Sequence, residues 1–181
     1  MLIGITGTQG AGKGTVVEYL KEKGYKHCSA RGLILEEVEK RGIEPTRANI
    51  SMVANELREQ FGADFVVKEY FRRSPEAQNI VIESIYTLAE VEALRERGGI
   101  ILAIDADPEI RYERIHNRGD STDHVSKEEF LEFQKKESES NNPAQQNMRA
   151  VFAVADFVIF NDNEIVELQK NIDVFLAKYK K

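Results

Sequence analysis

The chain has 181 residues, of which 41% are hydrophobic and 31% are charged, and its formal net charge is −6 at pH 7. This length predicts one domain with a single substantial core, and the composition excludes a disordered chain. The negative charge argues against a nucleic-acid-binding surface, because such surfaces are normally basic.

The chain contains one cysteine, Cys28, and no apolar run of membrane-spanning length. A single cysteine excludes an intrachain disulfide and favours a cytoplasmic location. The first apolar run begins at residue 2, so we expect no signal peptide. We therefore expect a cytoplasmic monomer without membrane or nucleic-acid partners.

Short apolar runs alternate with helical patterns along the chain, which predicts a parallel α/β fold. The expected strands are nearly continuously apolar, as strands covered on both faces are, and span residues 2–6, 25–28, 80–83, 100–105 and 157–160. The expected helices span residues 13–22, 32–41, 48–60, 63–73, 87–97, 108–117 and 164–179. We predict a three-layer sandwich around a five-stranded parallel sheet.

The first expected strand leads into a glycine-rich segment, residues 7–15, which reads Gly-Thr-Gln-Gly-Ala-Gly-Lys-Gly-Thr. A strand, a glycine-rich loop and a helix in this order are typical of a phosphate-binding loop, or P-loop. Glycine permits positive φ and close backbone approach, so successive N–H groups can point into one concavity at the positive end of the helix. We predict that the loop binds the phosphates of ATP through Gly7, Gly10, Ala11, Gly12, Lys13, Gly14 and Thr15.

One position of this loop departs from its usual form. The lysine is ordinarily followed by Ser or Thr, whose hydroxyl contacts Mg²⁺, whereas here Gly14 intervenes and the hydroxyl belongs to Thr15. This form resembles adenylate kinase and other nucleoside monophosphate kinases. In that family the metal is held largely through phosphates and water, which suits the strong hydration of Mg²⁺.

Two segments exceed what a sheet and its covering helices require. Residues 30–75 connect the second and third expected strands with several helices, and residues 119–149 are polar. In a protein that moves a phosphoryl group, such insertions are candidates for an acceptor-binding segment and a closing lid; plain surface insertions are the alternative. The P-loop NTPase core then consists of residues 1–29, 76–118 and 150–181.

Two carboxylates end expected strands at the edge of the sheet where ligands bind in open α/β folds. Glu83 ends the strand 80–83, and we predict that it orients Mg²⁺, through water and together with Thr15, or accepts a hydrogen bond from the acceptor. Asp105 ends the next strand, but the neighbouring Asp107 and Pro108 favour a helix-capping role for it.

Phosphoryl transfer requires positive charge along the transferring oxygens, and the arginine fork binds two such oxygens. Arg114 and Arg118 share one helix face directly before the polar insertion, and Arg111 is the weakest candidate of the three. Arg149 lies where the insertion rejoins the core, in a position to clamp phosphates as a lid closes, with a plain surface arginine as the alternative.

The acceptor side offers fewer signals. We predict that Arg31, just after the second strand, and Arg58, on a helix, bind the acceptor; a solvated side chain is the alternative for each. The three histidines have no metal-ligand spacing, and one cysteine does not make a zinc site.

The chain resembles the P-loop monophosphate kinases over nearly its whole length. The loop at residues 7–15 is similar to that of adenylate kinase, and the tail at 155–162 is similar to the end of dephospho-CoA kinase. A dephospho-CoA-kinase-related group shows the strongest resemblance, through the patterns at residues 36–42, 54–58 and 105–114.

The resemblance implies roles for several residues. It makes Glu83 the strand-end acid, Arg114 and Arg118 the arginines at the base of the lid, and Asn161 part of the loop beside the donor base. The chain departs from the family on the acceptor side. Many relatives have a Gly-Asp pair and an arginine where this chain has Arg31, Gly32 and Leu35, and arginine is commoner at the position of Tyr86.

The residues and the resemblance together predict ATP- and Mg²⁺-dependent phosphoryl transfer to a nucleoside or deoxynucleoside monophosphate. Lys13 would hold the outer phosphates and Glu83 would order metal-bound water, while three arginines would stabilise the transferring group: Arg114, Arg118 and Arg149. Two alternatives remain. One is dephospho-CoA kinase activity, and the other is a nucleotide-binding regulator or slow ATPase without an acceptor.

Overall fold

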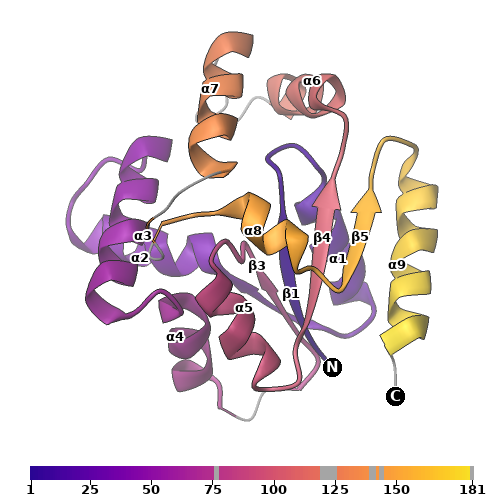
Figure 1. Ribbon diagram of the computed structural model, residues 1–181, viewed down its shortest axis with the longest axis horizontal. Helices are drawn as coiled ribbons and strands as arrows, with labels where there is room; N and C mark the ends of the chain where they lie inside the picture. The colour runs from indigo at the N-terminus through magenta and orange to yellow at the C-terminus, as the bar shows by residue number, and fades with distance from the viewer. Residues whose placement is uncertain (76–77, 119–125, 139–141, 143–144, 180–181) are drawn as a thin grey trace.

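The computed structural model describes residues 1–75, 78–118, 126–138, 142 and 145–179. Five parallel strands form one sheet in the order β2-β3-β1-β4-β5 (Figure 1). The strands are β1 (Leu2–Gly7), β2 (Lys26–Ser29), β3 (Ile80–Glu83), β4 (Ile100–Asp105) and β5 (Phe157–Phe160). The predicted five-stranded parallel sheet is therefore confirmed.

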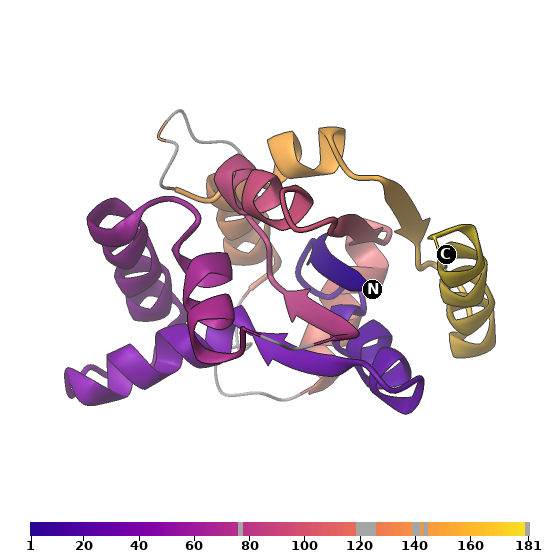
Figure 2. The same ribbon diagram turned by 90° about the horizontal axis from the view of Figure 1, so that it is seen from below.

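Helices cover both faces of the sheet and make the three predicted layers (Figure 2). On one face lie α1 (Lys13–Glu22) and α9 (Ile165–Tyr179), and on the other lie α4 (Phe65–Arg73), α5 (Leu88–Arg95) and α8 (Met148–Ala153). Alternation along each strand divides the apolar side chains between the faces. Ile3 and Ile5 of β1 pack toward α1 and α9, whereas Leu2 packs toward α5.

The remaining helices lie toward the carboxyl ends of the strands. Helices α2 (Ala30–Lys40) and α3 (Arg47–Phe61) follow β2 and share a small core of their own, formed by Ile34, Val38, Val53, Ala54 and Leu57. Helix α6 (Pro108–Arg118) lies beyond the end of β4, and α7 (Lys127–Ser138) packs beside α6 on the side away from β5 (Figure 1). The two predicted insertions thus flank the carboxyl edge of the sheet.

Capping side chains account for several helix ends. The Thr87 hydroxyl accepts a hydrogen bond from the Glu90 N–H, and the Glu90 carboxylate accepts one from the Thr87 N–H, which makes a capping box at the start of α5. The predicted cap at Thr87 is confirmed. Helix α2 begins two residues earlier than predicted, because the Ser29 hydroxyl accepts from the Gly32 N–H and caps the helix there.

Two helices, α7 and α8, were not predicted from the sequence. Helix α7 buries Phe130, which packs beside Tyr112 of α6 and under the Arg111 guanidinium. Helix α8 is capped by Asn147, whose side chain accepts from the Ala150 N–H, and it crosses the predicted boundary between lid and core at residues 149–150. No helix within the described ranges is long and apolar enough to span a membrane.

Burial of Cys28 provides a test of the packing between β2 and α4. Cys28 is 6% exposed, and burial raises the pKa of its thiol to about 12. The thiolate is the reactive form, so we expect the native protein at pH 8 to resist the thiol reagent DTNB, with full reaction only after unfolding. Rapid stoichiometric labelling of the native protein would contradict this placement.

Candidate active site

The glycine-rich segment joins β1 to α1 and is shaped by two positive-φ glycines. Gly10 has φ +80°, and a Cβ added there would lie 2.5 Å from the Arg111 carbonyl oxygen of α6. Gly12 has φ +96°, and an added Cβ would collide with the Asn161 side-chain amide. Neither position accepts a larger residue without displacement of its neighbour, so both glycines are required by the loop's path.

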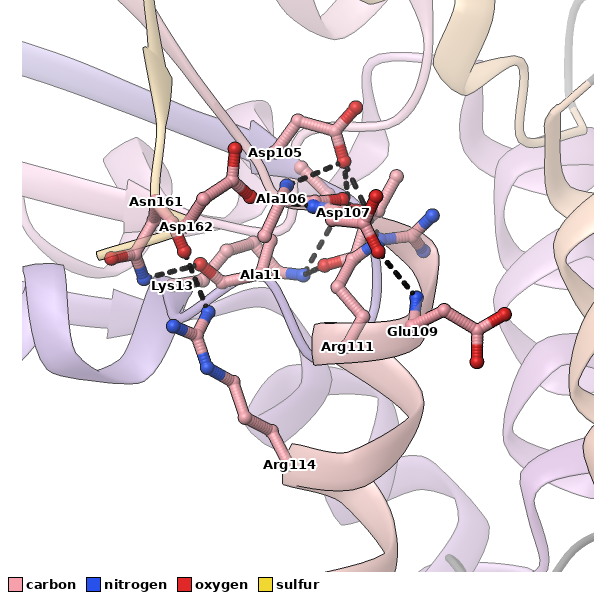
Figure 3. A network of polar contacts seen from close by, with 12 residues as sticks. Ala11, Lys13, Asp105, Ala106, Asp107, Glu109, Arg111, Arg114, Asn161 and Asp162 are labelled. Atoms are coloured by element: carbon pink, nitrogen blue, oxygen red, sulfur yellow. Dashed lines mark hydrogen bonds and ion pairs between the residues drawn. The ribbon is translucent and has the colours of Figure 1, made fainter. Parts of the chain in front are cut away.

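The first turn of α1 has no side-chain cap. Gly12 occupies the N-cap position, and a Cβ added at Gly14 would meet no atom within 4 Å. The helix therefore presents backbone N–H groups and the positive end of its dipole to an open space, which is the arrangement that binds phosphate. The Lys13 ammonium group donates hydrogen bonds to the carbonyls of Gly7 and Thr8, both at 2.8 Å (Figure 3).

Side chains from two strand ends anchor the loop (Figure 3). The Thr8 hydroxyl donates to Asp105 Oδ1 of β4 at 2.5 Å, and Asn161 Nδ2, just after β5, donates to the Ala11 carbonyl at 2.8 Å. The predicted helix-capping role of Asp105 is therefore wrong. Asp107 caps α6 instead, because its carboxylate accepts from the Glu109 N–H.

Asn161 is 7% exposed, and its contacts tie the loop to α6. Its side chain holds Ala11, while its own carbonyl accepts a hydrogen bond from Arg114 Nη1 at 2.9 Å. The family resemblance implies that Asn161 belongs to the loop beside the donor base. The structure places its side chain against the phosphate loop, and contact with the base stays a prediction.

Replacement of Asn161 by Ala tests this anchor. It leaves the buried Ala11 carbonyl without its donor, so we expect a loss of about 1–3 kcal/mol in the free energy of unfolding. Because the loop is also loosened, ADP should bind about tenfold more weakly, measured by calorimetry. The control is Asn171→Ala, because Asn171 lies half-buried on α9 and lines neither the cavity nor the hollow beside Arg114. Equal ADP affinities for the two variants would contradict the anchoring role.

A cavity of about 710 Å³ opens in front of the loop. It contains the predicted site residues Gly10, Gly12, Lys13, Gly14, Thr15, Arg31, Arg58, Glu83 and Arg114, together with Ser84, Tyr86 and an apolar wall of Ile34, Ile50 and Ala54. Arg149 is exposed on α8 and does not line it. Arg118 ends α6, and its side chain lies outside the described part of the structure.

Glu83 lies at the carboxyl end of β3, beside β1, and lines the cavity. A hydrogen bond from His27 at 3.1 Å is the main cause that lowers the pKa of Glu83, with smaller contributions from the charges of Lys13 and Arg31. Burial of Glu83 raises this pKa, but by less than the hydrogen bond and the charges together lower it. Glu83 is thus an ionised carboxylate at neutral pH.

The oxygen atoms of Thr15 and Glu83 suit Mg²⁺, a hard cation that prefers oxygen ligands. No group of three or more His, Cys, Asp or Glu side chains within the described ranges is arranged to hold a metal ion. An ion at this place would therefore take most of its ligands from substrate phosphates and water. The donor set fits the predicted metal in that form.

Arg58, predicted to bind the acceptor, makes a buried ion pair. Its side chain is 2% exposed and that of Glu90 is 0% exposed; Nε and Nη2 of Arg58 each lie 2.9 Å from Glu90 Oε1. The second Glu90 oxygen accepts from the N–H groups of Tyr86 and Thr87. The pair fixes α3 to the turn after β3, so Arg58 both borders the cavity and stabilises its wall.

Removal of Arg58 tests the importance of this pair. Arg58→Ala leaves the Glu90 carboxylate buried without its cation, so we expect a loss of about 3–5 kcal/mol in the free energy of unfolding, measured with urea. The control is Arg72→Ala, because Arg72 is 70% exposed in its pair with Glu69 and should contribute at most about 1 kcal/mol. Similar costs for both variants would contradict the buried pair.

The two other arginines of α6 have different surroundings. Arg111 is 2% exposed, donates from Nε to the Ala106 carbonyl at 2.8 Å and lies 3.6 Å from Asp105 Oδ1, so it holds the connection from β4 to α6. Arg114 lines the cavity and also a second hollow of about 620 Å³ between α6 and the connection from β5 to α9. Asp162 and Glu164 line this hollow as well.

Two features of the site were missed by the sequence analysis. His27 contacts Glu83 across neighbouring strands, and a signal was available, because alternation along β2 and β3 places both on one face once the strands are paired. Ser84, beside Glu83, has φ +70°, a backbone conformation that residues other than glycine seldom adopt. Nothing in the sequence marks Ser84 for this conformation.

Comparison with known proteins identifies the family to which this chain belongs. The profile of the AAA_18 family, described as an AAA domain, matches residues 3–151. A UPF0200 protein of Pyrococcus abyssi is 33% identical over 98% of this chain and 96% of its own length. The chain therefore belongs to the UPF0200 family and contains an AAA domain. A second member, from Methanocaldococcus jannaschii, is 31% identical over 100% of this chain and 95% of its own length.

Solved structures show the same fold at low sequence identity. The crystal structure of TT1252 from Thermus thermophilus has a TM-score of 0.68 at 22% identity, covering 100% of this chain and 98% of that one. Shikimate kinase from Bacteroides thetaiotaomicron has a TM-score of 0.61 at 14% identity, covering 100% and 99%. A gluconokinase from Sinorhizobium meliloti has a TM-score of 0.57 at 17% identity, covering 98% and 91%. This UPF0200 chain therefore has a P-loop kinase-like α/β fold.

Proposed function

We propose that the chain transfers the γ-phosphoryl group of ATP to a nucleoside or deoxynucleoside monophosphate in the presence of Mg²⁺. One observation carries the proposal: a single cavity of about 710 Å³ joins the phosphate loop to the wall made by α2 and α3. Ligand pockets usually measure about 300–1,000 Å³. Phosphoryl transfer depends mainly on holding donor and acceptor in line, which a shared cavity favours.

The donor would occupy the side of the cavity near α1. The uncapped N–H groups of α1 and the Lys13 ammonium group would receive the β- and γ-phosphates. Lys13 would exchange two neutral carbonyls for charged phosphate oxygens, which form stronger hydrogen bonds. Arg114, which lines the cavity, would stabilise charge on the transferring group, while the corresponding roles of Arg118 and Arg149 rest on the sequence alone.

The acceptor would occupy the side near α2 and α3. Ile34, Ile50 and Ala54 offer an apolar wall suited to a nucleobase. Arg31 is exposed at the start of α2, and its charge acts on Glu83, so it marks the phosphate end of this side. Glu90 neutralises the charge of Arg58, which leaves Arg31 as the stronger attraction for an acceptor phosphate.

Thr15 and Glu83 are the residues that would hold Mg²⁺, which when bound neutralises charge on the β- and γ-phosphates. Glu83 can serve in this way because it is ionised at neutral pH. We further propose that the segment 119–149, with α7, closes over the site and excludes water. Closure of this kind would favour transfer to the acceptor over hydrolysis of ATP.

A coupled assay of ADP release tests the proposal with all ribo- and deoxyribonucleoside monophosphates and with dephospho-CoA as acceptors. We expect at least one monophosphate to raise ADP release well above the rate without acceptor. Lys13→Ala should lower that rate by about 10²-fold or more. Lys21→Ala is the control, because Lys21 is exposed on α1 and pairs only with Glu18 among the described residues.

The other outcomes separate the alternatives. Transfer to dephospho-CoA alone would replace the nucleotide acceptor, and ATP binding without transfer to any acceptor would indicate a regulator or slow ATPase. Full activity of the Lys13→Ala variant would contradict the role of the loop itself.

A further inference from the structure

His27 lies on β2, at one edge of the sheet, and stands opposite Val81 of β3 in the parallel register. Side chains alternate along a strand, so His27, Val81 and Glu83 point to the same face of the sheet. Val81 packs on that face with Val16 of α1. His27 therefore lies on the face of the sheet that is covered by α1, the helix that begins at the phosphate loop.

The two side chains meet at the carboxyl edge of the sheet. His27 Nε2 lies 3.1 Å from Glu83 Oε2, and the side chains are 25% and 21% exposed. Because Glu83 is ionised, its oxygens only accept, so Nε2 carries the proton and donates. Within the described ranges, the Glu83 carboxylate has no other hydrogen bond, and its second oxygen is available to a ligand.

His27 does not line the cavity, whereas Glu83 does. Its contact with this cavity is therefore indirect, through Glu83, and we expect any effect of His27 on the reaction to pass through that carboxylate. A glutamate side chain has several rotatable bonds, and a partner that fixes one oxygen restricts where the other can go. Carboxylates that bind metals are commonly oriented by such a partner.

We propose that His27 is a positioning residue, which fixes one oxygen of Glu83 so that the other meets the hydrated metal ion of the bound nucleotide. This inference rests on the proposed function, because it assumes that Glu83 faces a metal–nucleotide complex. The geometry also explains how the edge strand β2 contributes to the site. It supplies the hydrogen-bond donor, His27, for the carboxylate at the end of β3.

The test uses Mn²⁺ as a probe for Mg²⁺ and follows free Mn²⁺ by electron paramagnetic resonance as it binds to the protein–ADP complex. We expect His27→Ala to weaken Mn²⁺ binding about tenfold, the usual effect of removing such a partner. His27→Gln, whose amide reaches about as far as Nε2, should restore most of the affinity, and the shorter His27→Asn should not. The control is His116→Ala, exposed on α6.

A merely structural role would not separate metal binding from nucleotide binding. We therefore expect all His27 variants to bind ADP like the wild type when EDTA removes the metal. Wild-type Mn²⁺ binding by His27→Ala, with weakened binding by Glu83→Gln, would overturn the inference alone. Wild-type Mn²⁺ binding by Glu83→Gln would instead overturn the metal role of Glu83 in the proposed function, and the inference with it.

Discussion

An α-helix leaves its first backbone N–H groups without partners, and in this protein those of α1 are left uncapped at the edge of a cavity. Three residues of the loop and the first turn keep these N–H groups accessible to a ligand. Gly12 turns the chain with φ +96°, Gly14 leaves open space, and Lys13 rests on loop carbonyls that a bound phosphate would replace. A preformed anion site of this kind needs little rearrangement on binding.

Strand ends hold both halves of the cavity. Asp105 of β4 fixes the phosphate loop through Thr8, and on the opposite side the Glu90–Arg58 pair fixes α3 to the turn after β3. Glu83 lines the same cavity from the end of β3, next to β1. The sheet thus sets the distance between the proposed donor and acceptor positions. In-line phosphoryl transfer requires this distance to be held constant.

The parts predicted from sequence are those fixed by local patterns: apolar runs gave the five strands, spacing gave the phosphate loop, and Thr87 marked the start of α5. The errors arose where partners are distant in the chain. The neighbouring Asp107 and Pro108 favoured a helix-capping role for Asp105, whose hydrogen bond to Thr8 spans 97 residues. The ion pair of Arg58, predicted to bind the acceptor, was missed because Glu90 is 32 residues away. Helix α7 depends on packing against α6, so its polar sequence did not reveal it.

The most direct measurement is a crystal structure with a dinucleoside polyphosphate that joins donor and acceptor in one molecule. The account predicts phosphates on the N–H groups of α1, one nucleoside in the hollow beside Arg114, and the other against Ile34 and Ile50. Phosphates bound away from the loop, or a second nucleoside outside the wall of α2 and α3, would contradict a shared site for donor and acceptor.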